Sequence, residues 1–204
     1  MGTVTDCYNP YEAKYSITRS ILKQLTKADC FLQIATKSKL ILRDLDLLKQ
    51  IRHLSVALSI NTLNDDFRRD MDCASTIQER IDCLKTLHEN GIYTILFMSP
   101  IFIGITDWQA IIEKSSGFVN EYWFENLNLR GSYKSVILQY VREYFPNVYP
   151  LYQQIYVKGD KAPLIEMENE IRTYCNRNKI LFSDYFHHEE VIQNPQNKIL
   201  ENNK

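Results

Sequence analysis

The sequence predicts an α/β protein built on a parallel sheet. Apolar runs of strand length alternate with segments of helical period along the chain. These runs are nearly continuous in β-branched and aliphatic residues, which is typical of strands covered on both faces. A length of 204 residues fits one domain. We expect this domain to span residues 1–193 and a polar tail to follow at 194–204.

Five strands of this kind are expected, and a short one follows near the C-terminus. The first begins at the second residue of the chain and ends in polar residues, and the next four are separated by helical segments. Their expected bounds are Gly2–Thr5, Phe31–Thr36, Leu54–Ile60, Ile92–Met98 and Phe118–Glu125, with the short strand at Ile180–Phe182.

The segments between these strands have the period of amphipathic helices. Ser16 is placed to cap the first helix, Thr76 and Glu79 have the spacing of a capping box, and Gly91 ends the third helix. The expected helices are Ser16–Thr26, Leu40–Ile51, Thr76–Asn90, Trp108–Lys114, Tyr133–Tyr144 and Pro163–Asn178.

The resulting strand–helix units are fewer than a closed parallel barrel holds. A first unit is missing at the front, so the prediction is a partial (β/α)6 TIM-like barrel. The strand at Gly2–Thr5 would leave one edge of the sheet unpaired, which proteins usually cover. We therefore expect the chain to be the C-terminal portion of a longer barrel.

Composition narrows the class of protein only a little. A net charge of −1 gives no global electrostatic footprint for nucleic acid or an anionic membrane. The apolar stretches are too short to cross a bilayer and no leader is visible, so we expect a cytoplasmic protein without membrane contact. The odd, scattered cysteines indicate reduced thiols: Cys7, Cys30, Cys73, Cys83 and Cys175.

Polar residues follow the expected strands at their carboxyl ends, where parallel-sheet enzymes hold their chemistry. On a barrel rim these residues would converge on one mouth. The segments are Thr5 and Asp6, then Thr36, Lys37 and Ser38, then Ser59, Asn61 and Thr62, then Ser99 to Gly104, and finally Asn126 to Arg130.

Several of these motifs occur together in one known family. They read, in order, "GTVTDCYNPYE", "IATKSKLILRDLDLLKQI", "VALSINTLNDDFRR", "ERIDCLKTLHENGI" and "MSPIFIGITD". Together they resemble the radical S-adenosylmethionine (SAM) proteins close to spore photoproduct lyase, a group described as DNA-repair photolyase-like. The resemblance runs from about Gly2 to about Asp107 and fades into a general barrel pattern by about Arg130.

The resemblance implies a partial (β/α)6 barrel whose first unit carries a CxxxCxxC loop. Three thiolates of that loop hold a [4Fe–4S] cluster, and the open iron takes the amine and carboxylate of SAM. This chain has no such triplet, so no metal ligands are expected within it. The cluster would need a missing N-terminal segment or a partner chain, and the chain alone is expected to be inactive.

By resemblance, three residues would hold the methionine part of SAM. Thr5 and Asp6 match the hydroxyl–acid pair near the methionyl amine, since both can accept hydrogen bonds from an ammonium. Lys37 would meet the methionyl carboxylate as a point charge. For Asp6 an Asx turn before "NP" remains an equal alternative.

The remaining site residues are assigned in the same way to the nucleoside part. Ser59 and Asn61 would bind the carboxylate or the ribose, and Pro100 and Ile101 would flank the adenine. Arg80 lies in the "ERI" motif, but the chain has "DMDCAST" where relatives have a proline-rich lead-in, so its role stays open. No catalytic residue is assigned.

The preferred interpretation is the SAM-binding remainder of a radical SAM enzyme. The intact enzyme would cleave SAM reductively and start radical chemistry, of lyase or DNA-repair type by resemblance, on a substrate that the sequence does not identify. The reason why the chain lacks the cysteine loop also stays open: a split gene, a mistaken start, an engineered truncation or a degenerate protein would each explain it. The sequence does not give the oligomeric state either.

Two alternatives belong to other classes. The first is an aldolase-like barrel in which Lys37 forms a Schiff base, which requires a desolvated amine with a lowered pKa. The second is a non-catalytic interaction module that kept the fold and lost the chemistry. This second alternative predicts a stable fold in which the edge of the first strand is covered.

Overall fold

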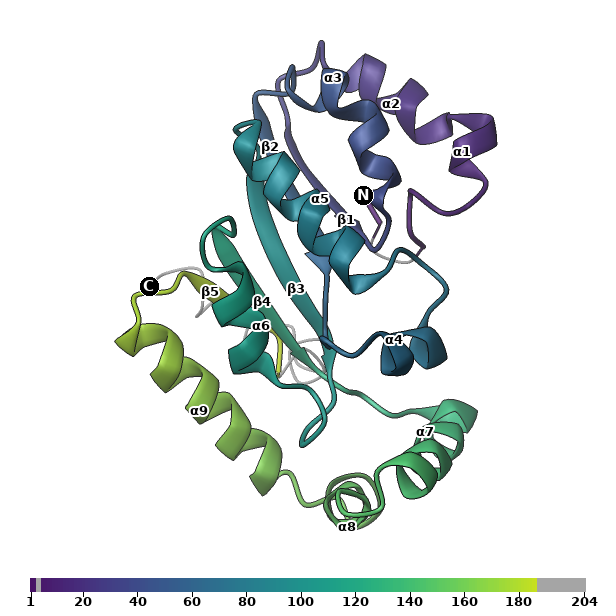
Figure 1. The fold of residues 1–204 in the computed structure, drawn as a ribbon, viewed down its shortest axis with the longest axis vertical. Coiled ribbons are helices and arrows are strands. Elements are labelled where there is room, and N and C mark those ends of the chain that lie inside the picture. The colour runs from purple at the N-terminus through teal and green to yellow at the C-terminus, as the bar shows by residue number, and fades with distance from the viewer. Residues whose placement is uncertain (3–4, 187–204) are drawn as a thin grey trace, which may run out of the picture.

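The computed structural model describes residues 1–2 and 5–186 (Figure 1). Within them, five parallel strands form one open sheet in the order β1-β2-β3-β4-β5. The strand order follows the chain order, as expected when each strand is joined to the next by a crossover. The predicted α/β class is therefore confirmed. The strands are β1 Phe31–Thr36, β2 His53–Ser59, β3 Tyr93–Ile101, β4 Glu121–Asn126 and β5 Phe182–Asp184.

Helices connect the strands and cover one face of the sheet. Figure 1 shows α5 and α6 lying across the same face, whereas α7 and α8 lie beyond the ends of β3 and β4. None of the helices in the described ranges has the length and apolar character needed to span a bilayer. The helices are α1 Glu12–Tyr15, α2 Ile17–Leu25, the 3₁₀ helix η1 Lys39–Asp44, α3 Leu45–Leu48, α4 Asp65–Met71, α5 Ile77–Glu89, α6 Trp108–Ser115, α7 Gly131–Tyr144, α8 Tyr149–Tyr152, the π-helix η2 Gln153–Val157 and α9 Ala162–Arg177.

Alternation along β1 separates a buried face from a more open one, whereas Val56 to Ser59 of β2 are buried on both faces, as the sequence predicts. Leu32 and Ile34 of β1 are buried, whereas Phe31 on the opposite face is 89% exposed. Because successive side chains of a strand point to opposite faces, this pattern puts the hydrophobic core between the sheet and the helices. The expectation that strands are covered on both faces is therefore wrong for β1, because the helices of this open sheet pack on one side.

The strand expected at Gly2–Thr5 falls partly on Thr3 and Val4, outside the described residues. Beside them, the Met1 nitrogen donates to the Gln33 carbonyl at 2.5 Å, and the Ala35 N–H donates to the Met1 carbonyl at 2.9 Å. Met1 thus bonds to the residues on either side of Ile34, which is the hydrogen-bond pattern of two parallel strands. The edge of β1 is thus paired at Met1. The expected domain boundary at 193 and the expected tail at 194–204 lie outside the described residues.

Gly2 allows the N-terminal segment to lie close to the backbone of β1. It has a φ of +89°, and a Cβ atom built on it would lie 2.1 Å from the Ala35 carbonyl oxygen. A side chain at this position is therefore excluded by both backbone conformation and space.

The first helices differ from the prediction. Ser16 has a φ of +49° and its side chain makes no cap hydrogen bond. Glu12 takes that role instead, because its carboxylate accepts from the Thr18 N–H at 2.9 Å and the Arg19 N–H at 3.3 Å. The helix expected at Leu40–Ile51 is a 3₁₀ helix followed by the short α3, and α4, α8 and η2 are additional elements.

The start of α5 agrees with the prediction. The Thr76 hydroxyl accepts from the Glu79 N–H at 3.2 Å, and the Glu79 carboxylate accepts from the Thr76 N–H at 2.9 Å. This is a complete capping box. It fixes the point at which α5 begins, and thereby the position of Arg80 in the first turn of the helix.

We expect Thr76→Ala to lower the free energy of unfolding by about 1 kcal/mol, because the substitution leaves a helix N–H without its acceptor. Urea denaturation followed by circular dichroism measures the change. Gln78→Ala, at an exposed position on the same helix, is the control and should shift stability by less than about 0.5 kcal/mol. Equal losses in the two variants would contradict the capping role.

Candidate functional site

The predicted site residues lie at one edge of the sheet, where β1, β2 and β3 end. The register pairs Thr36 with Leu58 and Ser59 with Phe97. Lys37 follows β1 directly, so it lies beside Ser59 at the end of the neighbouring strand. The structure therefore brings together side chains that are far apart in the sequence, as expected for the carboxyl edge of a parallel sheet.

Asp6 is fixed at this edge by three hydrogen bonds. One carboxylate oxygen accepts from the Thr36 hydroxyl at 2.7 Å and from the Tyr8 N–H at 2.8 Å, and the other accepts from the Lys37 N–H at 2.7 Å. The bond to Tyr8 is an Asx turn, so this alternative for Asp6 is present in the structure. The bonds to Thr36 and Lys37 add a second role, because they tie the loop to the end of β1. Thr5 precedes it with an exposed side chain.

Asn61 and Pro100 meet between the ends of β2 and β3. The Asn61 side-chain N–H donates to the Pro100 carbonyl at 2.9 Å, and the Thr106 hydroxyl donates to the Asn61 carbonyl at 2.8 Å. The bond between Ser99 and Pro100 is cis. Ile101 ends β3 with its side chain buried in the hydrophobic core. Two predicted residues thus touch directly, whereas Ile101 contributes mainly its backbone to this edge.

Arg80 and Asp72 belong to the same edge, although the sequence reasoning left Arg80 open and did not single out Asp72. The Arg80 side chain is 1% exposed. Its guanidinium donates to the Ser59 carbonyl at 3.0 Å, to the Ser75 carbonyl at 2.8 Å and to the Asp72 carboxylate at 2.5 Å. The other oxygen of Asp72 lies 3.7 Å from Lys37 Nζ. Arg80 and Asp72 therefore connect two predicted residues, Lys37 and Ser59.

One sequence signal could have identified Arg80. The buried stripe of α5 includes Ile77, Ile81 and Leu84, and Arg80 lies within that stripe. A cation is rarely fully buried unless it is paired, so an arginine at a core position of a helix predicts a buried acceptor nearby.

The surroundings of Lys37 differ from those that a Schiff-base lysine requires. Its side chain is 38% exposed and its ammonium lies beside the Asp72 carboxylate. Nucleophilic lysines are activated by desolvation or by a neighbouring cation, whereas a nearby carboxylate stabilises the charged form. This geometry gives the aldolase-like alternative no support.

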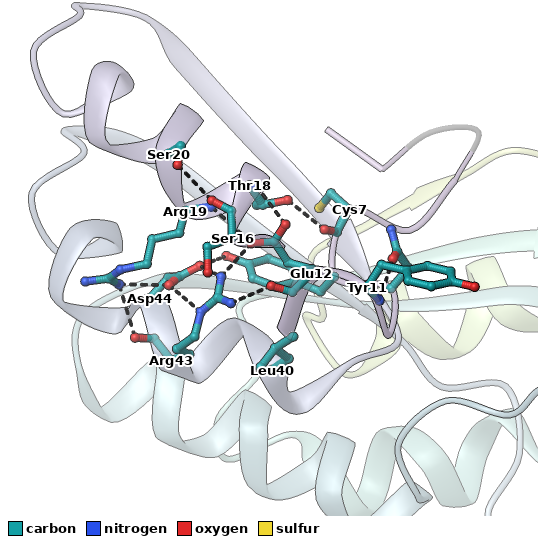
Figure 2. A network of polar contacts seen from close by, with 12 residues as sticks. Cys7, Tyr11, Glu12, Ser16, Thr18, Arg19, Ser20, Leu40, Arg43 and Asp44 are labelled. Atoms are coloured by element: carbon teal, nitrogen blue, oxygen red, sulfur yellow. Dashed lines mark hydrogen bonds and ion pairs between the residues drawn. The ribbon is translucent and has the colours of Figure 1, made fainter. Parts of the chain in front are cut away.

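A buried ionic network holds the segment that follows Asp6 (Figure 2). Asp44 is fully buried and accepts from the Arg19 and Arg43 guanidinium groups, each at 2.8 Å, and from the Tyr8 hydroxyl at 3.1 Å. Glu12 accepts from Arg43 at 2.6 Å. The network joins the loop, α1 and α2 to η1, and it therefore supports the loop that carries Asp6.

This network sets the protonation of its two acids. Burial raises the pKa of Asp44, but the hydrogen bonds from Arg43 and Arg19 outweigh it and hold the pKa below its ordinary value of 3.8. Burial likewise raises the pKa of Glu12, whereas hydrogen bonds from Arg43 and the Thr18 N–H bring it below 4.5. Both carboxylates are therefore ionised at neutral pH in the folded protein.

A second polar group lies on the face of the sheet opposite the helices. Glu121 accepts from the Trp123 indole N–H at 2.7 Å and from the Ser183 hydroxyl at 2.8 Å, and Ser99 donates to Glu125. Alternation places the two glutamates on one side of β4, while Tyr122 and Phe124 face the core. The aromatic rings that contact one another beside them are Phe97, Trp123 and Tyr185.

A groove lies elsewhere, between α6 and α9. It has a volume of about 760 Å³, and Trp108, Ile165 and Tyr174 are among its lining residues. None of the predicted site residues lines it. The groove has the volume of a ligand pocket, but the polar groups that converge at the strand ends make the sheet edge the better candidate.

The cysteines do not form a metal site in the described part of the chain. All five are free thiols. Within residues 1–2 and 5–186, no three His, Cys, Asp or Glu side chains are grouped as metal ligands would be. The described residues therefore do not offer the three thiolates that an iron–sulfur cluster of the expected kind requires.

Comparison with known proteins identifies the family. The family model of the radical SAM superfamily matches residues 1–113, more than half of the 204 residues. The chain belongs to the radical SAM superfamily.

Related proteins are known from archaea and bacteria. The chain is 40% identical over 152 residues to the uncharacterized protein MJ0683 of Methanocaldococcus jannaschii, covering 74% of the chain and 58% of the relative. It is 24% identical over 172 residues to the uncharacterized protein Rv2578c of Mycobacterium tuberculosis, covering 80% and 51%. The chain thus spans little more than half the length of these relatives.

Solved structures support the fold. Streptococcus suis SuiB bound to S-adenosylmethionine has a TM-score of 0.59 at 14% identity, over 84% of this chain and 37% of that one. SuiB bound to the precursor peptide SuiA has a TM-score of 0.58 and covers 36% of that chain. At this identity the likeness shows a shared fold, in agreement with a partial radical SAM barrel.

The ionic network predicts a loss of stability in acid. Glu12 and Asp44 have lower pKa values folded than unfolded, so their contribution is fully present above about pH 4.5 and is lost as pH falls through the folded values. Urea unfolding at pH 7, 5, 4 and 3 measures this. We expect a steady free energy of unfolding down to about pH 5 and a steep fall below it.

Asp44→Asn tests the source of that dependence. At pH 7 it should lower the free energy of unfolding by about 3 kcal/mol, because Arg19 and Arg43 lose a buried charged partner. It should also flatten the pH profile below pH 5. Parallel profiles for the variant and the wild type would show that Asp44 is not a source of the acid sensitivity.

Proposed function

We propose that this chain is the SAM-binding part of a radical SAM enzyme. One observation carries the proposal: Lys37, Ser59, Asn61 and Pro100, from the ends of β1, β2 and β3, lie at a single edge of the sheet, and Asp6 joins them from the N-terminal loop. Membership of the radical SAM superfamily supports the same ligand.

The polar groups of this edge complement the methionine part of SAM. Asp6 offers carboxylate oxygens with acceptor capacity beyond its bonds to the protein, and Thr5 adds a hydroxyl, so both suit an ammonium group. Lys37 offers a cation for the carboxylate. Asp6 and Lys37 are held beside each other because the backbone N–H of Lys37 donates to the Asp6 carboxylate.

The nucleoside part would bind between the ends of β2 and β3. Ser59 and Asn61 offer a hydroxyl and an amide, which suit ribose hydroxyls as donors and acceptors. Pro100 and Ile101 would flank the adenine through the proline ring and the backbone. The contact between Asn61 and Pro100 keeps the two halves of this region together.

The iron–sulfur cluster would come from outside the described residues. When bound, a [4Fe–4S] cluster supplies the electron that cleaves SAM and starts radical chemistry. We propose that its CxxxCxxC loop is provided by a preceding segment or by a partner chain, since the chain spans only 58% of one relative and 51% of another. The chain alone is then inactive.

The substrate would face the side of the sheet opposite the helices. Resemblance to spore photoproduct lyase extends the proposal to damaged DNA. However, Glu121 and Glu125 lie on that face, and their charge repels a polyanion. The geometry therefore favours SAM binding without favouring a nucleic-acid substrate.

We expect the protein to bind SAM in an isothermal titration, and we expect Lys37→Ala to weaken the affinity by about tenfold, because the methionyl carboxylate loses its cation. The matched control is Lys85→Ala, which removes an exposed lysine of α5 and should leave the affinity unchanged.

Absence of SAM binding by the wild type, or equal affinities of wild type and Lys37→Ala, would overturn the assignment. Borohydride trapping with a panel of small aldehydes and ketones tests the aldolase-like alternative. Trapping at Lys37 in place of SAM binding would favour that alternative.

A further inference from the structure

We propose that Asp72, held in place by Arg80, is a positioning residue that presents Lys37 to the carboxylate of SAM. The inference rests on the proposed function, because it concerns the same edge of the sheet. It goes beyond that function by naming two residues, from the α4–α5 loop and from α5, on which the cofactor contact depends.

The position of Asp72 is fixed by the surrounding loop. Its Oδ1 accepts from Arg80 at 2.5 Å and from the Ala74 N–H at 3.0 Å, and its carbonyl accepts from Arg68 at 3.2 Å. The side chain is 16% exposed. Asp72 is therefore a largely buried carboxylate with little freedom to move, and its Oδ2 is the oxygen that lies toward Lys37.

Arg80 joins this carboxylate to the sheet. Its guanidinium binds the Ser59 carbonyl at the end of β2 and the Ser75 carbonyl just before α5, as well as Asp72. A planar group that makes three directed bonds has essentially one orientation. The end of β2, the α4–α5 loop and Asp72 therefore form one rigid unit.

Lys37 is held at both ends by carboxylates. Its backbone N–H donates to Asp6 at 2.7 Å, and its Nζ lies 3.7 Å from Asp72 Oδ2. A lysine side chain is flexible and loses rotamer freedom when it binds a ligand. Because Asp72 already restricts the ammonium, part of that loss has occurred before SAM binds, which raises the affinity.

The charges of the unit also fit an anionic ligand group. Arg80 and Lys37 are cations that share the single Asp72 carboxylate, which leaves one positive charge over, and Asp6 beside Lys37 is the acid that the ammonium of SAM is expected to pair with. Arg80 is buried and shielded, whereas the Lys37 side chain is 38% exposed. The remaining positive charge is therefore available at Lys37, where the methionyl carboxylate is expected.

The test compares SAM with 5′-methylthioadenosine, which keeps the adenosine but lacks the amine and carboxylate. Asp72→Asn should weaken SAM binding by about tenfold, or about 1.4 kcal/mol, and leave the affinity for methylthioadenosine unchanged. In a Lys37→Ala background the same substitution should have no further effect, because the two residues act through one contact. Asp82→Asn, an exposed acid on α5, is the control.

A second variant covers the case in which Asp72→Asn does not fold. Asp72→Glu keeps a charged partner for Arg80 but displaces the carboxylate by one methylene. It should weaken SAM binding by about threefold, with methylthioadenosine again unchanged. Thermal unfolding of each variant shows whether the protein tested is folded.

The outcomes separate the two proposals. If Lys37→Ala weakens SAM binding but the Asp72 variants bind SAM as well as the wild type or better, the positioning role is wrong and the proposed function stands. Equal losses for SAM and methylthioadenosine would show a general structural role and would also overturn the inference. If the wild type binds no SAM, both proposals fail together.

Discussion

The parallel register of β1, β2 and β3 is the constraint on which the candidate site depends. Thr36 is paired with Leu58, and Ser59 with Phe97, so β1 and β2 end within one residue of each other and β3 continues past them to Ile101. A shift of one residue along β1 would turn its core side chains to the more open face. Burial of the helix-covered face therefore fixes the register, and the register in turn fixes Lys37 beside Ser59.

Side-chain hydrogen bonds then hold the loops that leave these strands. Asp6 ties its loop to the end of β1, Arg80 ties the α4–α5 loop to the end of β2, and Asn61 joins the end of β2 to that of β3. Loops lack the regular hydrogen bonds of helices and strands, so such side-chain bonds determine their position. The buried network around Asp44 adds a support behind the Asp6 loop. The edge is thus ordered before any ligand binds.

The sequence predicts the features that depend on local pattern. The bounds of β1 and the capping box at Thr76 agree with the structure, because alternation and capping act over a few residues. Helix capping at Ser16 is wrong, since Glu12 reaches the same N–H groups from outside the helix. The contact of Asp72 with Arg80 was not predicted, because neither residue follows a strand and their pairing depends on how a loop folds. Strand-end reasoning thus predicts a candidate site at this edge, whereas the residues that support it require the tertiary structure.

Hydrogen–deuterium exchange with and without SAM tests the central claim most directly, namely that the ends of β1, β2 and β3 form one cofactor site. The account predicts slower amide exchange on SAM addition in residues 37–39, 60–62 and 100–104 together, with no change in the groove between α6 and α9. Protection in that groove, or in only one of the three segments, would contradict it.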